Sequence, residues 1–397
     1  MALVTLSLTP LKQTFWTQGF RPFFLGAGSF AILSVILWLG LYGLHWQLLP
    51  PHYPPLWWHM HEMIFGYTLA VIAGFLLTAV KNWTQITPAP PILLKVLVVL
   101  WLVARLLPFS PLPNYLVALA DLSFDLLLVI LIGKSLLKAK HYKQLPILGI
   151  LSALTLTNGF FYLGLLGYNA NGLLIGLYLG FYIILGLLMV MGRRVIPYFI
   201  EHGINTPFKA TQYRWLDILI IITFIMFVVS EMIGFSTQNN TAQTFSGILA
   251  VIQALLHGFR LWGWYHPNIW GMPLLWSLVL GYGWISVGFL LKYFHVVADV
   301  PYSQSIHAFA YGALAMITVS MMSRVALGHS GRNVNNPPSL LRIIFILLFA
   351  GAFIRVFYTW IVPEYYEIWI ILSQSIWILA FTAWTITYFP IFTKPSQ

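Results

Sequence analysis

The chain has 397 residues, of which 60% are hydrophobic and only 7% are charged. A soluble domain carries about 25% charged residues, so these charges are too few to cover a water-facing surface, and we expect the outer surface to face lipid. The sequence contains no cysteine, which excludes disulfides, thiolate metal sites and a cysteine nucleophile. The net charge of +11 is spread over short segments between apolar runs, so it predicts membrane orientation and no nucleic-acid binding.

Apolar runs of membrane-spanning length follow one another along the chain. A helix of about 20 apolar residues crosses the hydrocarbon core of a bilayer, and helices satisfy all of their own backbone hydrogen bonds there. We therefore predict an all-α polytopic integral membrane protein with about twelve transmembrane helices, in contact with the lipid bilayer. The predicted spans are residues 23–44, 61–80, 91–107, 114–133, 145–166, 171–191, 215–235, 244–264, 273–292, 305–327, 340–361 and 366–389.

The basic residues predict the orientation of these spans. Of the 20 lysines and arginines, all except Arg105, Lys292 and Arg355 fall on one side of the membrane when the spans are threaded alternately. Basic residues are retained on the cytoplasmic side, so we expect both termini to be cytoplasmic. The predicted organisation is a cytoplasmic segment at 1–22, a single membrane domain at 23–390 and a cytoplasmic tail at 391–397.

The second predicted span has two histidines and a glutamate at its outer end, His59, His61 and Glu62. Residues two apart on a helix point about 200° from each other, so a regular helix would not bring both histidines to one ion. Either the helix begins at His61 with His59 still in the loop, or one histidine is a ligand and the other supports it. Glu62 would orient an imidazole through its ring N–H.

Charged side chains inside three other spans are the next signal. Arg105 lies in the third span, Asp121 and Asp125 lie one turn apart in the fourth, and Arg355 lies in the eleventh. Such residues face the interior of a helix bundle, and we expect Arg105 to pair with Asp121. They are either functional residues or structural ion pairs that lock helices together, and arginines would also suit haem propionates.

Three more histidines are candidate ligands of a metal or of haem. His307 opens the tenth span at the predicted depth of His61, so the two are expected to face each other across the bundle. His295 lies at the outer end of the ninth span, and His329 lies on the cytoplasmic side after the tenth. The alternative is that these are interfacial histidines bonded to loops.

Arginines and glycines also gather on the predicted cytoplasmic side. The segment 192–197 follows the sixth span and the segment 328–332 follows the tenth. Guanidinium groups and free backbone N–H groups of such loops can bind anions, whereas topological anchoring alone would explain the basic residues. The expected basic site consists of Arg193, Arg194, Arg324 and Arg332.

Several of these stretches together closely resemble the NnrS family: Phe20-Arg21-Pro22-Phe23-Phe24, residues 58–63, residues 74–84, Gly192 to Pro197 and residues 307–332. The resemblance implies a bacterial inner-membrane protein that contains haem and copper and is associated with denitrification and with the response to nitric oxide and nitrosative stress. One departure is Val279, where many members carry a histidine. The resemblance carries motif residues onto His59, His61, His307, His329, Arg21, Arg193, Arg324 and Arg332.

Three functional hypotheses follow. The first is a haem- and copper-binding membrane protein that meets nitric oxide or a nitrosyl species near its outer face, with enzymatic turnover left open. The second is a secondary transporter of a small solute that uses buried Asp and Arg residues. The third, an oxidase or nitric oxide reductase subunit, is disfavoured because the sequence has no adjacent histidine pair and no His-Pro-Glu-Val run.

Overall fold

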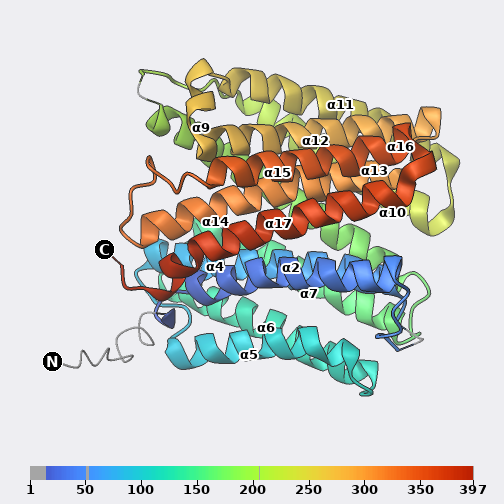
Figure 1. The fold of residues 1–397 in the computed structure, drawn as a ribbon, viewed down its shortest axis with the longest axis horizontal. Coiled ribbons are helices and arrows are strands. Elements are labelled where there is room, and N and C mark those ends of the chain that lie inside the picture. The colour runs from blue at the N-terminus through green and yellow to red at the C-terminus, as the bar shows by residue number, and fades with distance from the viewer. Residues whose placement is uncertain (1–14, 51–52, 205, 397) are drawn as a thin grey trace.

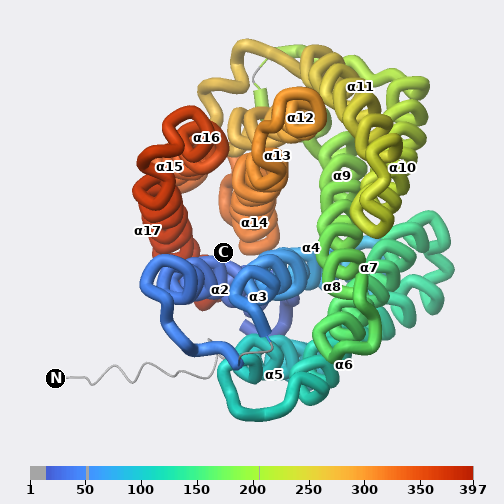
Figure 2. The backbone as a smooth tube through the Cα atoms, turned by 90° about the vertical axis from the view of Figure 1, so that its right-hand side faces the viewer, coloured from blue at the N-terminus to red at the C-terminus, as the bar shows by residue number. Residues whose placement is uncertain are grey.

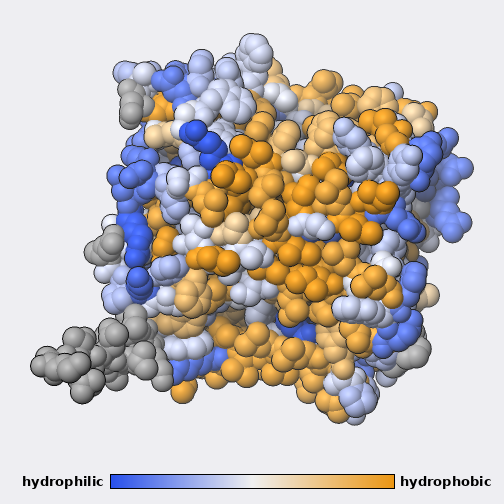
Figure 3. Space-filling model, viewed as in Figure 1, coloured by the Kyte–Doolittle hydropathy of each residue, from blue (hydrophilic) through white to orange (hydrophobic). Residues whose placement is uncertain are grey.

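The computed structural model describes residues 15–50, 53–204 and 206–396. Over these residues the elements are helical, and twelve segments are long and apolar enough to cross a membrane, which confirms the predicted fold class. The start of the first span and the end of the last lie at one end of the bundle (Figure 1); we call it the terminal end, and the opposite one the distal end. A broad apolar belt separates two polar ends (Figure 3), as expected for a multi-pass membrane protein.

Several of the twelve spans consist of more than one helical element. In chain order, separated by semicolons, the spans are α2 (Phe20–Gly43); α3 (Pro55–His61), η1 (Glu62–Thr68) and α4 (Leu69–Thr84); α5 (Pro91–Leu106) and η2 (Leu107–Phe109); α6 (Asn114–Lys138); η3 (Tyr142–Gln144) and α7 (Leu145–Leu165); α8 (Gly172–Leu174), η4 (Ile175–Leu179) and α9 (Gly180–Gly203); α10 (Arg214–Thr237); α11 (Asn240–Trp264); α12 (Pro273–Ala298); α13 (Tyr302–His307), η6 (Ala308–Ala315) and α14 (Met316–His329); α15 (Leu341–Phe353), η7 (Ile354–Tyr358) and α16 (Thr359–Ile361); and η8 (Pro363–Tyr365) with α17 (Tyr366–Thr393).

Four spans switch from α-helical to π-helical hydrogen bonding in the distal half of the bundle. These π-turns are η1, η4, η6 and η7. In η1 the hydroxyl of Thr68 donates to the carbonyl of Met63 at 2.7 Å and so provides this carbonyl with a hydrogen bond where the helix is irregular. Because π-turns are rare and often occur at functional sites, the distal half of the bundle is the first candidate location for a site.

The centre of the bundle is formed by the spans that carry the motif histidines. The most apolar stretch of the second span is 83% buried and that of the tenth is 78% buried, against 33% for the spans of α5 and α10. Seen from the distal end, α2 and α3 lie between the α5–α6 pair and the α13–α14 span (Figure 2). Side chains on opposite faces of α3 therefore meet different partners.

Two differences from the predicted boundaries bear on the candidate site. The second span begins at Pro55 instead of residue 61, so His59 is helical. The sixth span ends at Gly203 instead of residue 191, and the segment Gly192–Pro197 is helix instead of loop. In both cases the edge of the apolar run marks where the chain leaves the apolar layer, whereas the helix continues beyond it. Residues 1–14 of the predicted segment 1–22 lie outside the described residues.

Candidate functional site

A group of buried polar side chains lies between the second span and the α5–α6–α7 layer. We call it the carboxylate cluster. All of its members are nearly or fully excluded from solvent. It consists of His61, Glu62, Arg105, Asp121, Asp125, Asn158 and Tyr162.

Arg105 joins two of the carboxylates in this cluster. Its Nη1 donates to Oε2 of Glu62 at 2.6 Å, and its Nη2 donates to Oδ1 of Asp121. The contact between Arg105 and Asp121 that the sequence predicts is therefore present. Charge-assisted hydrogen bonds of this kind are the strong ones, and they connect η1, α5 and α6 inside the bundle.

His61 is fully buried and is held through both ring nitrogens. Its Nδ1 lies 3.1 Å from Oε1 of Glu62, as expected for a carboxylate that orients an imidazole. Its Nε2 lies 3.0 Å from Oδ1 of Asn158 and 3.2 Å from Oδ2 of Asp121. Because both nitrogens are engaged, His61 has no free lone pair for a metal in this arrangement.

Asn158 and Tyr162 were not predicted as site residues. Asn158 donates through Nδ2 to Oδ2 of both Asp121 and Asp125, at 3.0 and 2.9 Å, and the Tyr162 hydroxyl donates to Oδ2 of Asp121 at 3.0 Å. The sequence feature that could have indicated them is a single amide side chain in the apolar fifth span, one turn before a tyrosine. Neutral polar residues are common enough in membrane helices that this signal is weak.

A second group lies on the opposite face of α3. The ring of His59 stacks on Trp38 of α2, with 4.4 Å between ring centroids and 15° between planes. Its Nδ1 is buried and has no hydrogen-bond partner among the described residues. This nitrogen is therefore available to bind a metal ion or another ligand.

His307 belongs to the same group. His59 and Arg355 both lie within electrostatic range of its ring. Its Nδ1 donates to the carbonyl of Ser303 at 2.7 Å, which leaves the lone pair of a neutral ring on Nε2. Arg355, in the π-turn η7, has a buried Nη1 without a partner among the described residues. We call His59 and His307 the histidine pair.

The expectation that His61 faces His307 was wrong. The helix α3 is regular from Pro55 to His61, so its two histidines point to opposite sides. His61 enters the carboxylate cluster and His59 approaches His307. The structure thereby excludes the alternative in which the helix begins at His61 with His59 still in the loop.

His295 lies apart from the histidine pair. Its Nδ1 donates to the carbonyl of Val300 at 2.8 Å, and its ring lies 5.2 Å from that of Tyr302. Tyr302 donates in turn to Glu231, which forms a buried ion pair of 2.9 Å with Lys292. Lys292 is one of the three basic residues predicted on the outer side, and the sequence pattern did not indicate Glu231 as its partner.

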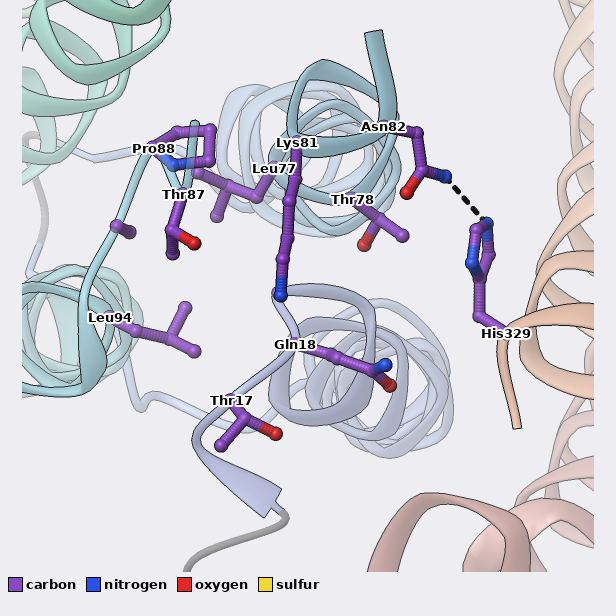
Figure 4. Close-up of a pocket in the computed structure, with 12 residues that line it drawn as sticks. Thr17, Gln18, Leu77, Thr78, Lys81, Asn82, Thr87, Pro88, Leu94 and His329 are labelled. Atoms are coloured by element: carbon purple, nitrogen blue, oxygen red, sulfur yellow. Dashed lines mark hydrogen bonds between the residues drawn. The ribbon is translucent and has the colours of Figure 1, made fainter. Parts of the chain in front are cut away.

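His329 lies at the terminal end, about 33 Å along the tenth span from His307 at a rise of about 1.5 Å per residue. Its Nε2 lies 3.4 Å from Nδ2 of Asn82. It lines a pocket with about 60 Å³ of space for water-sized molecules, to which Lys81 and Gln18 also contribute (Figure 4). His329 therefore belongs to a separate location from the histidine pair.

The predicted basic site is not formed by two loops. Arg193 and Arg194 lie within α9, where backbone N–H groups are used by the helix, and Arg193 pairs with Asp217 at 2.5 Å. Arg324 lies in α14 with its guanidinium 4.1 Å from the ring centroid of Phe199. Only Arg332 follows a helix, and its Nη1 is buried without a partner among the described residues.

The side chains near the candidate site limit how a metal ion could be bound there. Within residues 15–50, 53–204 and 206–396 there is no group of three or more His, Asp and Glu side chains arranged to hold a metal ion. The histidine pair supplies two imidazoles, so a metal there needs further ligands of its own. Val279 is buried near the start of α12 at the terminal end, so the departure from the family pattern does not lie beside the histidine pair.

No curated protein matches the chain at a significant level. The family model described as NnrS protein matches residues 14–396, which is nearly the whole chain. This match agrees with the motifs in the second and tenth spans, which the fold brings to its centre. The chain therefore belongs to the NnrS family.

Proposed function

We propose that the protein is a haem- and copper-binding bacterial inner-membrane protein of the nitric oxide response, and that the histidine pair holds the metal. Membership of the NnrS family supports a role in the nitric oxide response in general. The observation that carries the site is Nδ1 of His59, which is buried without a partner among the described residues. The bond from Nδ1 of His307 to Ser303 places the lone pair of a neutral ring on Nε2 of His307.

The donor set would suit haem because a porphyrin brings nitrogen ligands of its own, so His59 and His307 would supply the imidazoles that hold the iron. The bond to Ser303 fixes the tautomer of His307, as such bonds do for metal-binding histidines. The unpaired Nη1 of Arg355 is available to a propionate. Copper also accepts imidazole ligands. Either metal, when bound, would supply a centre at which nitric oxide can coordinate.

Absorption spectra and metal content of purified variants test this proposal. We expect His59→Ala and His307→Ala each to lose the Soret band, or the bound copper if copper is the occupant. His202→Ala is the matched control, because His202 makes the same bond to the carbonyl four residues earlier, at 2.8 Å, but is exposed at the terminal end. Wild-type spectra and metal content in both pair variants would contradict the site.

A secondary transporter is the second candidate, and the buried pair of Glu231 and Lys292 favours it. This pair lies in the other half of the bundle from the carboxylate cluster and is bonded to Tyr182, Tyr302 and Ser246. Paired charges inside a membrane bundle often mark ion or proton pathways of transporters. Solute uptake into proteoliposomes by metal-free protein, abolished by Lys292→Gln, would favour transport over metal binding.

A further inference from the structure

The hydrogen bonds of His61 fix the protonation of its ring. Nδ1 faces only the carboxylate of Glu62, and Nε2 faces the amide oxygen of Asn158 and a carboxylate oxygen of Asp121. Oxygens of these kinds accept hydrogen bonds. A neutral imidazole has one N–H and would leave one nitrogen lone pair against an acceptor. The ring is therefore satisfied only as the imidazolium.

The orientation of Asn158 is fixed by the same network. Its Nδ2 lies 3.0 Å from Oδ2 of Asp121 and 2.9 Å from Oδ2 of Asp125. Only the NH₂ group can donate to these oxygens, so the amide oxygen must face His61. The reversed amide would place its oxygen against two carboxyl groups.

The remaining charge of the cluster points to a second proton. Even with both Arg105 and His61 positive, ionised Glu62, Asp121 and Asp125 would leave at least one uncompensated negative charge. All five side chains are buried, and an uncompensated buried charge is strongly destabilising. A proton on Asp125 makes the cluster neutral.

The neighbours of the cluster agree with a proton on Asp125. Tyr162 is neutral because its hydroxyl donates to Asp121. Burial raises the pKa of Tyr53 well above its ordinary value, and the charge of Glu62 raises it further, so this tyrosine is neutral as well. Oδ1 of Asp125 is buried without a partner among the described residues, an arrangement that costs less for a neutral carboxylic acid than for a carboxylate.

We propose that the carboxylate cluster is a proton-binding site within the membrane, with its exchangeable proton on Asp125, which shares the Asn158 amide with Asp121. The site can release the Asp125 proton at the cost of one buried charge. This assignment rests on the side chains of the cluster alone and holds whether or not the histidine pair binds a metal.

Infrared spectroscopy of the purified protein tests the site. We expect the wild type at neutral pH to show the carbonyl band of a buried carboxylic acid, shifted in D₂O, and to lose it as the pH is raised. Asp125→Asn should lack this band, whereas Asp299→Asn, an exposed substitution of the same kind, should retain it. An Asp125→Asn spectrum that still contains the band would overturn the proposal.

The wild type gives a second readout that does not depend on the folding of an Asp125 variant. A wild-type spectrum at neutral pH without the band of a buried carboxylic acid would also overturn the proposal, even if the metal site proved correct.

Discussion

Gly66 shows how closely single residues are fitted around the carboxylate cluster. A Cβ atom there would lie 2.7 Å from Oε2 of Glu62, 2.7 Å from the Phe30 ring and 2.9 Å from Nη1 of Arg105. We predict that Gly66→Ala destabilises the protein by about 1–3 kcal/mol, because overpacking displaces the bonded charges. Thermal unfolding in detergent measures the effect.

Gly159 is the matched control for that substitution. It lies in α7 next to Asn158, and a Cβ there meets no other atom within 4 Å. Gly159→Ala should leave the stability unchanged or raise it by roughly 0.5–1 kcal/mol, since alanine restricts the unfolded chain. Equal melting temperatures for the Gly66 and Gly159 variants would show that the close contacts carry no cost.

Of these substitutions, replacement of Arg105 is predicted to reduce the stability of the protein most. Arg105→Gln would leave Glu62 and Asp121 buried without their common partner, which costs about 3–5 kcal/mol. Arg342→Gln, at an exposed arginine of α15, should have little effect. Denaturation of both variants in the same detergent provides the comparison, and similar midpoints would show that Arg105 is not needed to balance the cluster.

At the residue scale, charges were predictable and geometry was not. Arg105 and Asp121 stand out because charged residues are rare in apolar runs, and their contact was expected from their depth alone. Whether His59 or His61 approaches His307 depends on where α3 begins, and hydrophobicity does not determine that residue. Asn158 could not be assigned because its importance comes from the two aspartates that it joins.

At the scale of helices, the number of spans was predictable and their internal irregularities were not. Length and composition identify twelve apolar runs, because a bilayer imposes a minimum length on each. The π-turns η1, η6 and η7 depend on packing between spans, for which the sequence has no periodic signal. These turns lie beside the histidine pair and Arg355, so the local departures from the α-helix coincide with the candidate site.

The contact between α2 and the end of α17 gives a prediction at this scale. Nη1 of Arg21 donates to the carbonyls of Ile391, Phe392 and Lys394, at 3.1, 2.8 and 2.8 Å. These groups are carbonyls at a helix end, which lack partners within the helix. Arg21→Gln should release the last turn of α17 and speed its removal by carboxypeptidase.

The control for the Arg21 variant is Lys95→Gln, also at the terminal end. Lys95 lies 5.7 Å from the centroid of the Trp16 ring and makes none of the bonds to α17. The cleavage rate of this variant should match that of the wild type. Unchanged trimming of Arg21→Gln would mean that α17 is held by its apolar packing against α2 alone.

At the scale of the whole molecule, the uneven distribution of basic residues predicts which end of the bundle faces the cytoplasm. All but Arg105, Lys292 and Arg355 are assigned to the terminal side, and the three exceptions lie in buried or distal positions, two of them paired with carboxylates. Exceptions that are neutralised inside the bundle do not oppose the positive-inside rule. The terminal end is therefore expected to be cytoplasmic and the histidine pair to lie toward the outer face.

Labelling of single cysteines in intact cells tests this orientation, because the chain has no cysteine of its own. Asn171→Cys and Asn240→Cys place a thiol at exposed distal positions, and Asn335→Cys places one at an exposed terminal position. A membrane-impermeant maleimide should label the two distal thiols at once and the terminal thiol only after the membrane is opened. The reverse pattern would place the histidine pair toward the cytoplasm, and nitric oxide from outside would then reach it only after crossing the bilayer.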